Sequence, residues 1–153
     1  MEEERENRVS AVIVDAAIEV HRVLGGPGLL ESVYEEALAW ELSNRGLDVK
    51  RQVALPIQYK GVRLASPLAI DLLVDTCVIL ENKATAQYND IFESQLLTYL
   101  RLSGLKLGLV LNFGEKAGEG WNSPRGKRPL ISAPSRLCAS ALEFRIAQSA
   151  IKE

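Results

Sequence analysis

Apolar and polar positions recur along the chain with two different periods, and these periods predict where helices and strands form. Apolar residues with helical spacing occupy residues 6–24 and again residues 29–45. The sequence GGPG at residues 25–28 separates the two, because glycine and proline both interrupt a helix. The chain is therefore expected to open with two helices that each bury one face.

Short apolar runs of the kind found in strands come next. Lys60 and Gly61 lie between two of them as a tight turn, and a second turn is expected near Asp75 and Thr76. Residues 88–103 have helical spacing and end at Gly104. The predicted strands cover residues 48–54, 57–59, 62–64, 69–75, 77–83 and 105–113.

This order of elements predicts an α/β protein of the mixed α+β kind, with a mixed sheet of four or five strands flanked by helices. Residues 1–114 are expected to form the domain that carries this sheet. Residues 115–153 are expected to be a divergent C-terminal loop, rich in Gly, Pro and charge, followed by a short helix at 136–148. No function follows from that last part.

The amino-acid composition excludes few classes of protein. The chain has 153 residues, 47% of them apolar and 25% charged, which is typical of a globular protein. A formal net charge of −2 gives no overall attraction to nucleic acid, so binding to a polyanion would need local basic residues or a metal ion. Two cysteines form no disulfide framework, and Cys77 is expected to be a small buried side chain.

The N-terminal sequence MEEERENR is acidic and does not resemble a signal peptide. No apolar run approaches the roughly 18 residues that a membrane-spanning helix needs. We therefore expect a cytoplasmic protein with no membrane partner.

Charged residues interrupt two of the predicted strands, where side chains are normally buried. Asp71 lies in one strand, and Glu81, Asn82 and Lys83 lie in the next. Across a hairpin, Asp71 is expected near Glu81, and Glu81 and Lys83 share one face of their strand. Two carboxylates, with the Asn82 backbone carbonyl as a third ligand, suit Mg²⁺, which keeps several waters and leaves room for phosphate oxygens. The alternative is a cross-strand ion pair at a solvated end of the sheet.

Other residues are candidates for the same site. Gln95 and Tyr99 share a helix face at a spacing of i, i+4, where they could hold a phosphate or support the lysine, or simply form the polar flank of the helix. Glu31 in the first turn of the second helix is a further candidate ligand, although the helix dipole alone favours an acid there. Glu35 and Glu36 are expected to be more exposed. His21 is another candidate ligand, or a histidine stabilised by the end of its helix.

Taken in order, Asp71, Glu81-x-Lys83 and Gln95-x-x-x-Tyr99 resemble the PD-(D/E)xK nuclease superfamily, in particular its RecB-type branch with a QxxxY motif. Residues 17–114 are similar to the small prokaryotic GxxExxY protein family of that superfamily. The segments that carry the similarity are IEVHRVLGGPGLLESVYEEAL, ILENKAT and ESQLLTYLRLSGLKLGLVLNFG, the first of which contains Gly28, Glu31 and Tyr34.

The resemblance implies a restriction-endonuclease-like αβββαβ core and hydrolysis of DNA phosphodiester bonds with Mg²⁺ or Mn²⁺. Asp71 and Glu81 would bind the metal, Lys83 would be the catalytic lysine, and Glu31, Gln95 and Tyr99 would assist. A homodimer is a further expectation from the resemblance. One departure is that the chain after Gly114 does not show the short basic and apolar strand expected to complete such a protein.

A nuclease-like fold can persist after cleavage has been lost. The second hypothesis is therefore a catalytically inactive module that binds nucleic acid or protein. A third is a structural role in which the charges are only ion pairs.

Overall fold

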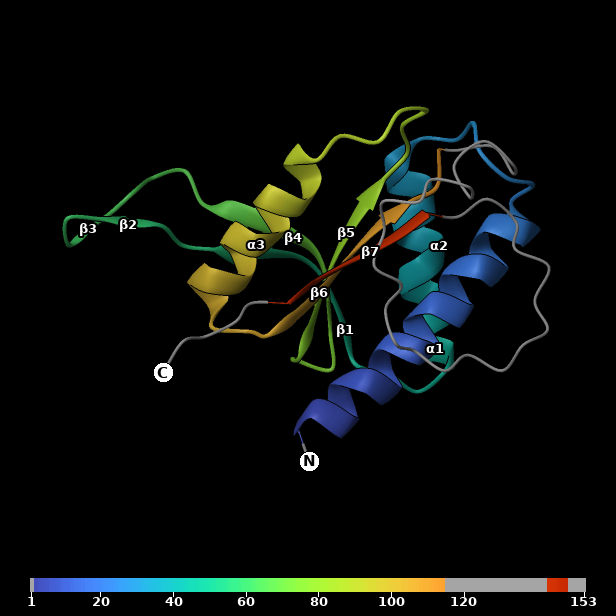
Figure 1. Ribbon diagram of the computed structural model, residues 1–153, viewed down its shortest axis with the longest axis horizontal. Helices are drawn as coiled ribbons and strands as arrows, with labels where there is room; N and C mark the ends of the chain where they lie inside the picture. Colours follow the sequence, from blue (N-terminus) through green and yellow to red (C-terminus); the bar gives the residue numbers. More distant parts are fainter. Residues whose placement is uncertain (1, 115–142, 149–153) are drawn as a thin grey trace.

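The computed structural model describes residues 2–114 and 143–148, which form helices on both faces of one mixed sheet (Figure 1). The elements follow one another as α1 (Glu2–Val23), α2 (Glu31–Asn44), β1 (Val49–Leu55), β2 (Gln58–Tyr59), β3 (Val62–Arg63), β4 (Leu68–Val74), β5 (Val78–Lys83), α3 (Ile91–Ser103), β6 (Leu107–Asn112) and β7 (Glu143–Gln148). The predicted α/β class with a mixed sheet flanked by helices is confirmed, and the elements from α2 to β6 provide the αβββαβ core.

The main sheet has the strand order β1-β4-β5-β6-β7, and β2 and β3 form a separate two-stranded ribbon. β4 and β5 make an antiparallel hairpin whose turn has positive φ at Asp75 and Thr76, at the predicted position. β5 and β6 run parallel, and α3 makes the crossover that a parallel pair requires. The other neighbouring pairs are antiparallel.

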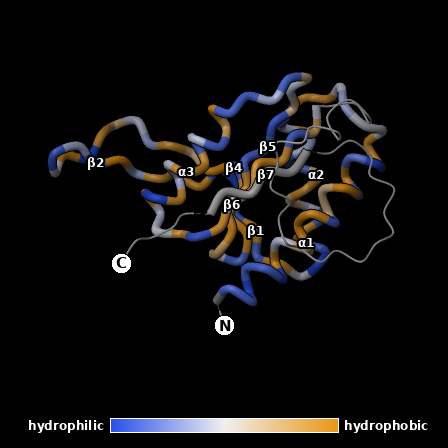
Figure 2. Tube along the Cα trace, viewed as in Figure 1, coloured by the Kyte–Doolittle hydropathy of each residue, from blue (hydrophilic) through white to orange (hydrophobic). Residues whose placement is uncertain are grey.

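Two hydrophobic cores lie on opposite faces of the sheet. One buries α1 and α2 against β4, β5 and β6, with Ile13, Leu38 and Leu80 completely buried. The other buries α3, where Leu96 packs so closely on β6 that a Cβ at Gly108 would lie 2.6 Å from its Cδ1. Figure 2 shows the apolar residues concentrated in the central strands and hydrophilic residues at the start of α1.

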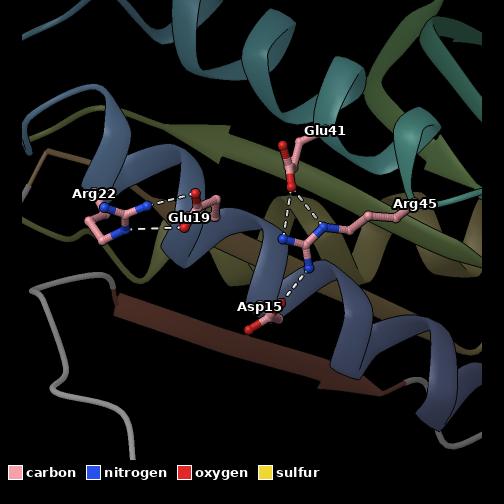
Figure 3. Close-up of polar contacts among 5 residues, drawn as sticks. All are labelled: Asp15, Glu19, Arg22, Glu41 and Arg45. Carbon is pink, nitrogen blue, oxygen red and sulfur yellow. Dashed lines mark hydrogen bonds and ion pairs between the residues drawn. The ribbon is translucent and has the colours of Figure 1, made fainter.

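Polar contacts fix α1 and α2 to each other at their exposed edges (Figure 3). The guanidinium of Arg45, just after α2, pairs with Asp15 of α1 and, at 2.8 Å, with Glu41 of α2. Arg22 pairs with Glu19 within α1 at 2.7 Å. These ion pairs are made by residues of α1, of α2 and of the residue just after α2, and they do not involve the strand residues described below.

The prediction of a helix at residues 136–148 is wrong at its described end. Residues 143–148 form β7, which pairs antiparallel with β6 from Leu107↔Gln148 to Asn112↔Glu143. Apolar Phe144 and Ile146 are two residues apart, a spacing that is compatible with a strand. The edge of β6 also offers unpaired backbone groups that a strand satisfies. Residues 115–142, including the predicted loop at 115–135, lie outside the described part of the chain.

Cys77 is buried, as predicted. Along the described residues no helix combines the length and the apolar character needed to cross a membrane. The division of the chain at residue 114 stays a prediction, although β7 joins the sheet built by the residues before it.

Candidate active site at the end of strand β5

Strand β4 separates from β5 at Asp71, and this separation opens the site. The last β4–β5 pair is Leu72↔Leu80, so Asp71 and Glu81 lie just beyond the ladder. Leu72 packs against the α1/α2 core whereas Ile70, two residues earlier, packs under α3. Since residues two apart on a regular strand share a face, β4 must rotate at Asp71.

The neighbouring strand is irregular at the same level. On β1 the register with β4 passes from Arg51↔Leu72 to Val53↔Ile70, and Gln52 between them has a φ of 50°. A left-handed conformation is strained for a residue with a side chain and persists where surrounding contacts hold it. Both β1 and β4 are therefore irregular at this level, and the C-terminal half of β5 has no paired strand on that side.

Asp71 is held by the backbone of β5. Its Oδ2 accepts a hydrogen bond from the Asn82 N–H at 2.8 Å. Burial raises the pKa of the Asp71 carboxyl, the Asn82 amide opposes this shift, and the negative charge of Glu35 adds to it. The carboxylate is thus fixed in position and lies near one negative charge, that of Glu35, and one positive charge, that of Lys83.

Glu81 is the most perturbed acid of the site. Only 4% of the residue is exposed, and burial together with repulsion from Asp71 raises the pKa of its carboxyl to about 8. Its Oε1 has no hydrogen-bond partner. Its Oε2 lies 3.9 Å from the Lys83 Nζ, which is too long a contact to offset the burial. A buried carboxylate with a free oxygen is suited to binding a cation.

Lys83 lies on the same face of β5 as Glu81 and projects toward α3. Its side chain is largely buried, and its Nζ lies 5.2 Å from the centre of the Phe92 ring. The aromatic ring and the apolar stem keep the ammonium group in place beside the carboxylates. The spacing of two residues predicted that Glu81 and Lys83 share a face, but the sequence did not predict the position of Lys83 near Phe92.

The backbone of Asn82 faces the gap left by β4. Phe113 N–H donates to the Lys83 carbonyl at 2.7 Å, so that carbonyl points toward the β6 side. Successive carbonyls of a strand point to opposite edges, and the N–H and C=O of one residue share an edge. The Asn82 carbonyl therefore points toward Asp71, on the side to which its N–H already donates.

Helix α2 brings Glu31 toward the same place. Glu31 is exposed overall, yet the pKa of its carboxyl is raised, mainly by burial of the group itself, and it responds to the charges of Lys83 and Asp71. Tyr34, one turn later, positions the preceding loop: its hydroxyl donates to the Gly26 carbonyl at 2.6 Å and accepts from the Leu29 N–H at 3.2 Å. Its ring also stacks on Phe113.

Helix α3 contributes Tyr99 more clearly than Gln95. Tyr99 is 8% exposed, and burial, then the charges of Glu81 and Asp71, raise the pKa of its phenol. Its hydroxyl therefore lies within electrostatic range of both carboxylates. Gln95 is one turn earlier on the same side of the helix and is exposed.

His21 is buried at the end of α1, with its ring centre 6.3 Å from that of Phe113. Burial lowers the pKa of its imidazole. The charges that shift Asp71, Glu81 and Glu31 come from acids and from Lys83, and His21 is not among them. The structure thus places His21 under the GGPG loop, in packing contacts, and does not bring it together with the three carboxylates.

Sequence reasoning missed Glu35 and Gln52. Glu35 is 6% exposed, so the expectation of an exposed side chain is wrong for it and correct for Glu36. Glu35 accepts hydrogen bonds from Arg51 Nε at 3.1 Å and from Gln52 Nε2 at 2.8 Å. The Gln52 side chain also acts on Asp71, where it opposes the rise in the carboxyl pKa that burial causes. The available signal was the i, i+4 spacing of Glu31 and Glu35 on one helix face.

The oxygen atoms of this site fit a hard divalent cation that takes few of its ligands from the protein. Within the described residues, no three His, Cys, Asp or Glu side chains are arranged as a complete metal cluster. Asp71, Glu81 with its free Oε1 and the Asn82 carbonyl do converge, and Mg²⁺ commonly takes one or two carboxylates and keeps its other ligands as water. Burial, followed by repulsion from Asp71, raises the pKa of Glu81, and a bound cation would offset both effects.

The chain matches a model of a known protein family. Comparison with curated proteins and with solved structures found no match for this chain. The family model of the PD-(D/E)XK nuclease superfamily matches residues 7–123, a stretch that contains every residue of the site. The chain therefore belongs to the PD-(D/E)XK nuclease superfamily, whose members are generally nucleases.

Proposed function

We propose that this protein is a Mg²⁺- or Mn²⁺-dependent nuclease that hydrolyses phosphodiester bonds of DNA. The observation that carries the proposal is the convergence of Asp71, Glu81 and Lys83 at the point where β4 leaves β5. Two acids and an ammonium group in a partly buried position are costly for stability, which argues for a function.

In this proposal Asp71, Glu81 and the Asn82 carbonyl would hold the metal, and Glu31 is a further candidate ligand. When bound, the metal lowers the pKa of a water molecule and stabilises the charge of the transition state. Burial raises the pKa of Glu81 to about 8, and this carboxyl would have to be deprotonated to hold the cation, because a metal ligand must be deprotonated.

The remaining side chains act on the phosphate. Lys83 stabilises negative charge on the non-bridging oxygens and orients the attacking water, since the Phe92 ring limits the movement of its ammonium group. The Tyr99 hydroxyl and the Gln95 amide are hydrogen-bond donors on the α3 side of the same site. His21 has no role in this mechanism.

The assignment of the chain to one family and one branch of the superfamily is also a proposal. Gly28, Glu31 and Tyr34 follow the GxxExxY pattern, and Gln95 and Tyr99 follow the QxxxY pattern of the RecB-type branch. The structural role of Tyr34 supports the first, because this residue fixes the loop that leads to Glu31. Action as a homodimer in the cytoplasm stays a prediction from the sequence.

A cleavage assay tests the proposal. Purified protein is incubated with duplex, single-stranded and branched DNA, and with RNA, in Mg²⁺, Mn²⁺ or EDTA. We expect metal-dependent DNA cleavage, and a loss of about 10²- to 10³-fold in rate for Lys83→Ala, comparable to the loss of a transition-state charge contact.

Lys106→Ala is the matched control, because it removes a lysine beyond the opposite end of the sheet, next to the start of β6. Its rate should equal that of the wild type. Equal rates for wild type and Lys83→Ala, or cleavage that persists in EDTA, would contradict the proposal. Binding of DNA with no cleavage under any condition would favour the inactive interaction module.

A further inference from the structure

A two-stranded ribbon projects from the body of the protein, and the proposed mechanism makes no use of it. We call residues 56–67 the arm; it contains β2 and β3 and extends away from the sheet at one side of Figure 1. Its tip is the pair Lys60 and Gly61, both with positive φ, which is the conformation of a tight two-residue hairpin turn. Leu64 N–H donates to the Ile57 carbonyl at 2.9 Å and extends the ribbon toward the body.

The arm begins at the same end of the sheet as the candidate active site. It leaves β1 after Leu55 and returns at Leu68, and these two residues pair with each other. Asp71 is three residues beyond Leu68 on the same strand. Ten residues of extended chain between the tip and Asp71 span at most about 33 Å, close to ten base pairs of duplex DNA at about 3.4 Å each.

The charge of this region is opposite to that of the whole chain. Residues 49–70 contain Lys50, Arg51, Lys60 and Arg63 and no acidic residue, although the chain carries a net charge of −2. Residues 58–67 are exposed throughout. Lys60 and Arg63 are therefore a local cationic feature on an arm that reaches away from the carboxylates, which suits a phosphate backbone.

The two faces of the ribbon differ in chemistry. Gln58 and Arg63 pair across the strands on one face, and Tyr59 and Val62 pair on the other. Arginine and glutamine are the side chains that bind guanine and adenine edges, and the major groove of B-DNA admits a two-stranded ribbon. Lys60 lies 5.5 Å from the centre of the Tyr59 ring, so an aromatic surface and a cation are adjacent at the tip.

The apolar face alone is too small for a stable contact between two copies of the chain. Tyr59, Val62 and Leu64 are 61%, 63% and 41% exposed. Even complete burial of such side chains in both copies would cover on the order of 500 Å², below the roughly 1,000 Å² expected of a specific protein interface. Charge and shape both favour a polyanionic partner with a groove.

We propose that the arm enters the major groove of duplex DNA and holds it across the carboxylates, so that double-stranded DNA is the substrate. The inference deepens the proposed nuclease function and rests on it. Duplex RNA is excluded as an equal ligand, because its major groove is too deep and narrow for such a ribbon.

Binding is measured separately from cleavage, in EDTA, by fluorescence anisotropy of labelled 25-base-pair duplex DNA with the full chain. The double variant Lys60→Ala/Arg63→Ala should bind about tenfold or more weakly at 0.1 M salt. The slope of log K against log salt should fall by about two, as expected for two lost phosphate contacts. Tyr59→Ala should weaken binding without changing the slope.

The matched control is Arg5→Ala/Arg8→Ala, which removes two positive charges from the start of α1, near the β4–β5 turn where Arg5 donates to the Asp75 carbonyl. Its affinity for duplex DNA should stay within about twofold of that of the wild type, since no arm contact is lost. Circular dichroism confirms that each variant is folded.

The outcomes separate the arm from the active site. The inference would be overturned if the Lys60→Ala/Arg63→Ala variant kept the duplex DNA affinity and the salt slope of the wild type. It would also be overturned if the control variant lost as much DNA affinity as the arm variant, or if the arm variant lost as much affinity for duplex RNA as for duplex DNA. A change in sedimentation coefficient on Tyr59→Ala, with DNA affinity intact, would assign the arm to self-association and also overturn it. If DNA is bound through the arm and never cleaved, the nuclease proposal fails and the inference about the arm stands.

Discussion

The two halves of strand β5 have almost the same burial and opposite chemistry. Val78, Ile79 and Leu80 are completely buried and pair with both β4 and β6. Glu81, Asn82 and Lys83 pair only with β6, and the first two are nearly as buried. The difference lies in β4, which rotates at Asp71 and leaves the second half beside a gap. A polar site can thus be built inside a sheet by removing one neighbouring strand for three residues.

The paired half should respond to a change as a hydrophobic core does. Leu80→Ala leaves a cavity between the sheet and the two helices α1 and α2, and we expect a loss of about 3 kcal/mol in the free energy of unfolding. Chemical denaturation measures this loss. The rate of cleavage per folded molecule should stay near that of the wild type, since Leu80 faces away from the carboxylates. A stable variant with no activity would show that the two halves are coupled.

The protein should become more stable when the negative charge of Glu81, in the unpaired half of β5, is removed. The folded-state pKa of Glu81 is raised to about 8 from 4.5, so the folded protein binds this proton more tightly than the unfolded chain. In EDTA the wild type should therefore lose stability as the pH rises from about 4.5 to 8, by up to about 5 kcal/mol.

Glu81→Gln lacks this titration and should be more stable than the wild type at pH 8, and little different at pH 4.5. Thermal unfolding across this pH range in EDTA measures the difference. A constant difference between the two proteins at every pH would mean that the carboxyl has an ordinary pKa, and would contradict the burial of an uncompensated acid.

Substitution of Glu35, whose charge acts on Asp71, should have the smallest effect on the free energy of unfolding. Glu35→Gln removes one negative charge from the neighbourhood of Asp71 and weakens the contact with Arg51, a partly exposed ion pair. These effects oppose each other, so the free energy of unfolding should change by less than about 1 kcal/mol. Urea denaturation measures it, with Glu36→Gln as the exposed control. A loss of several kcal/mol would make Glu35 a structural anchor of β1.

The sequence predicted the parts of this comparison that depend on local pattern. The charges at Asp71, Glu81 and Lys83 stand out in apolar strands, and glycine and proline mark the turns around them. The left-handed Gln52 was not predictable, because its side chain bonds to Glu35, which lies on another element. The burial of Glu35 was missed for the same reason, since its partners lie on β1.

The error at residues 143–148 has a different origin. Their pairing with β6 joins segments that are more than thirty residues apart in the chain. A short amphipathic run supports a helix and a strand about equally well, and only the open edge of β6 decides between them. Tertiary context thus overrode the local pattern at the edge of the sheet.

Calorimetric titration of Mn²⁺ and Mg²⁺ into the wild type and Asp71→Asn, with and without duplex DNA, tests most directly whether the unpaired half of β5 is a cation site. We predict about one equivalent bound in the millimolar range or tighter, with proton release near pH 7 from Glu81, and at least tenfold weaker binding in Asp71→Asn. No binding up to about 10 mM under either condition, or equal binding by both proteins, would contradict the account.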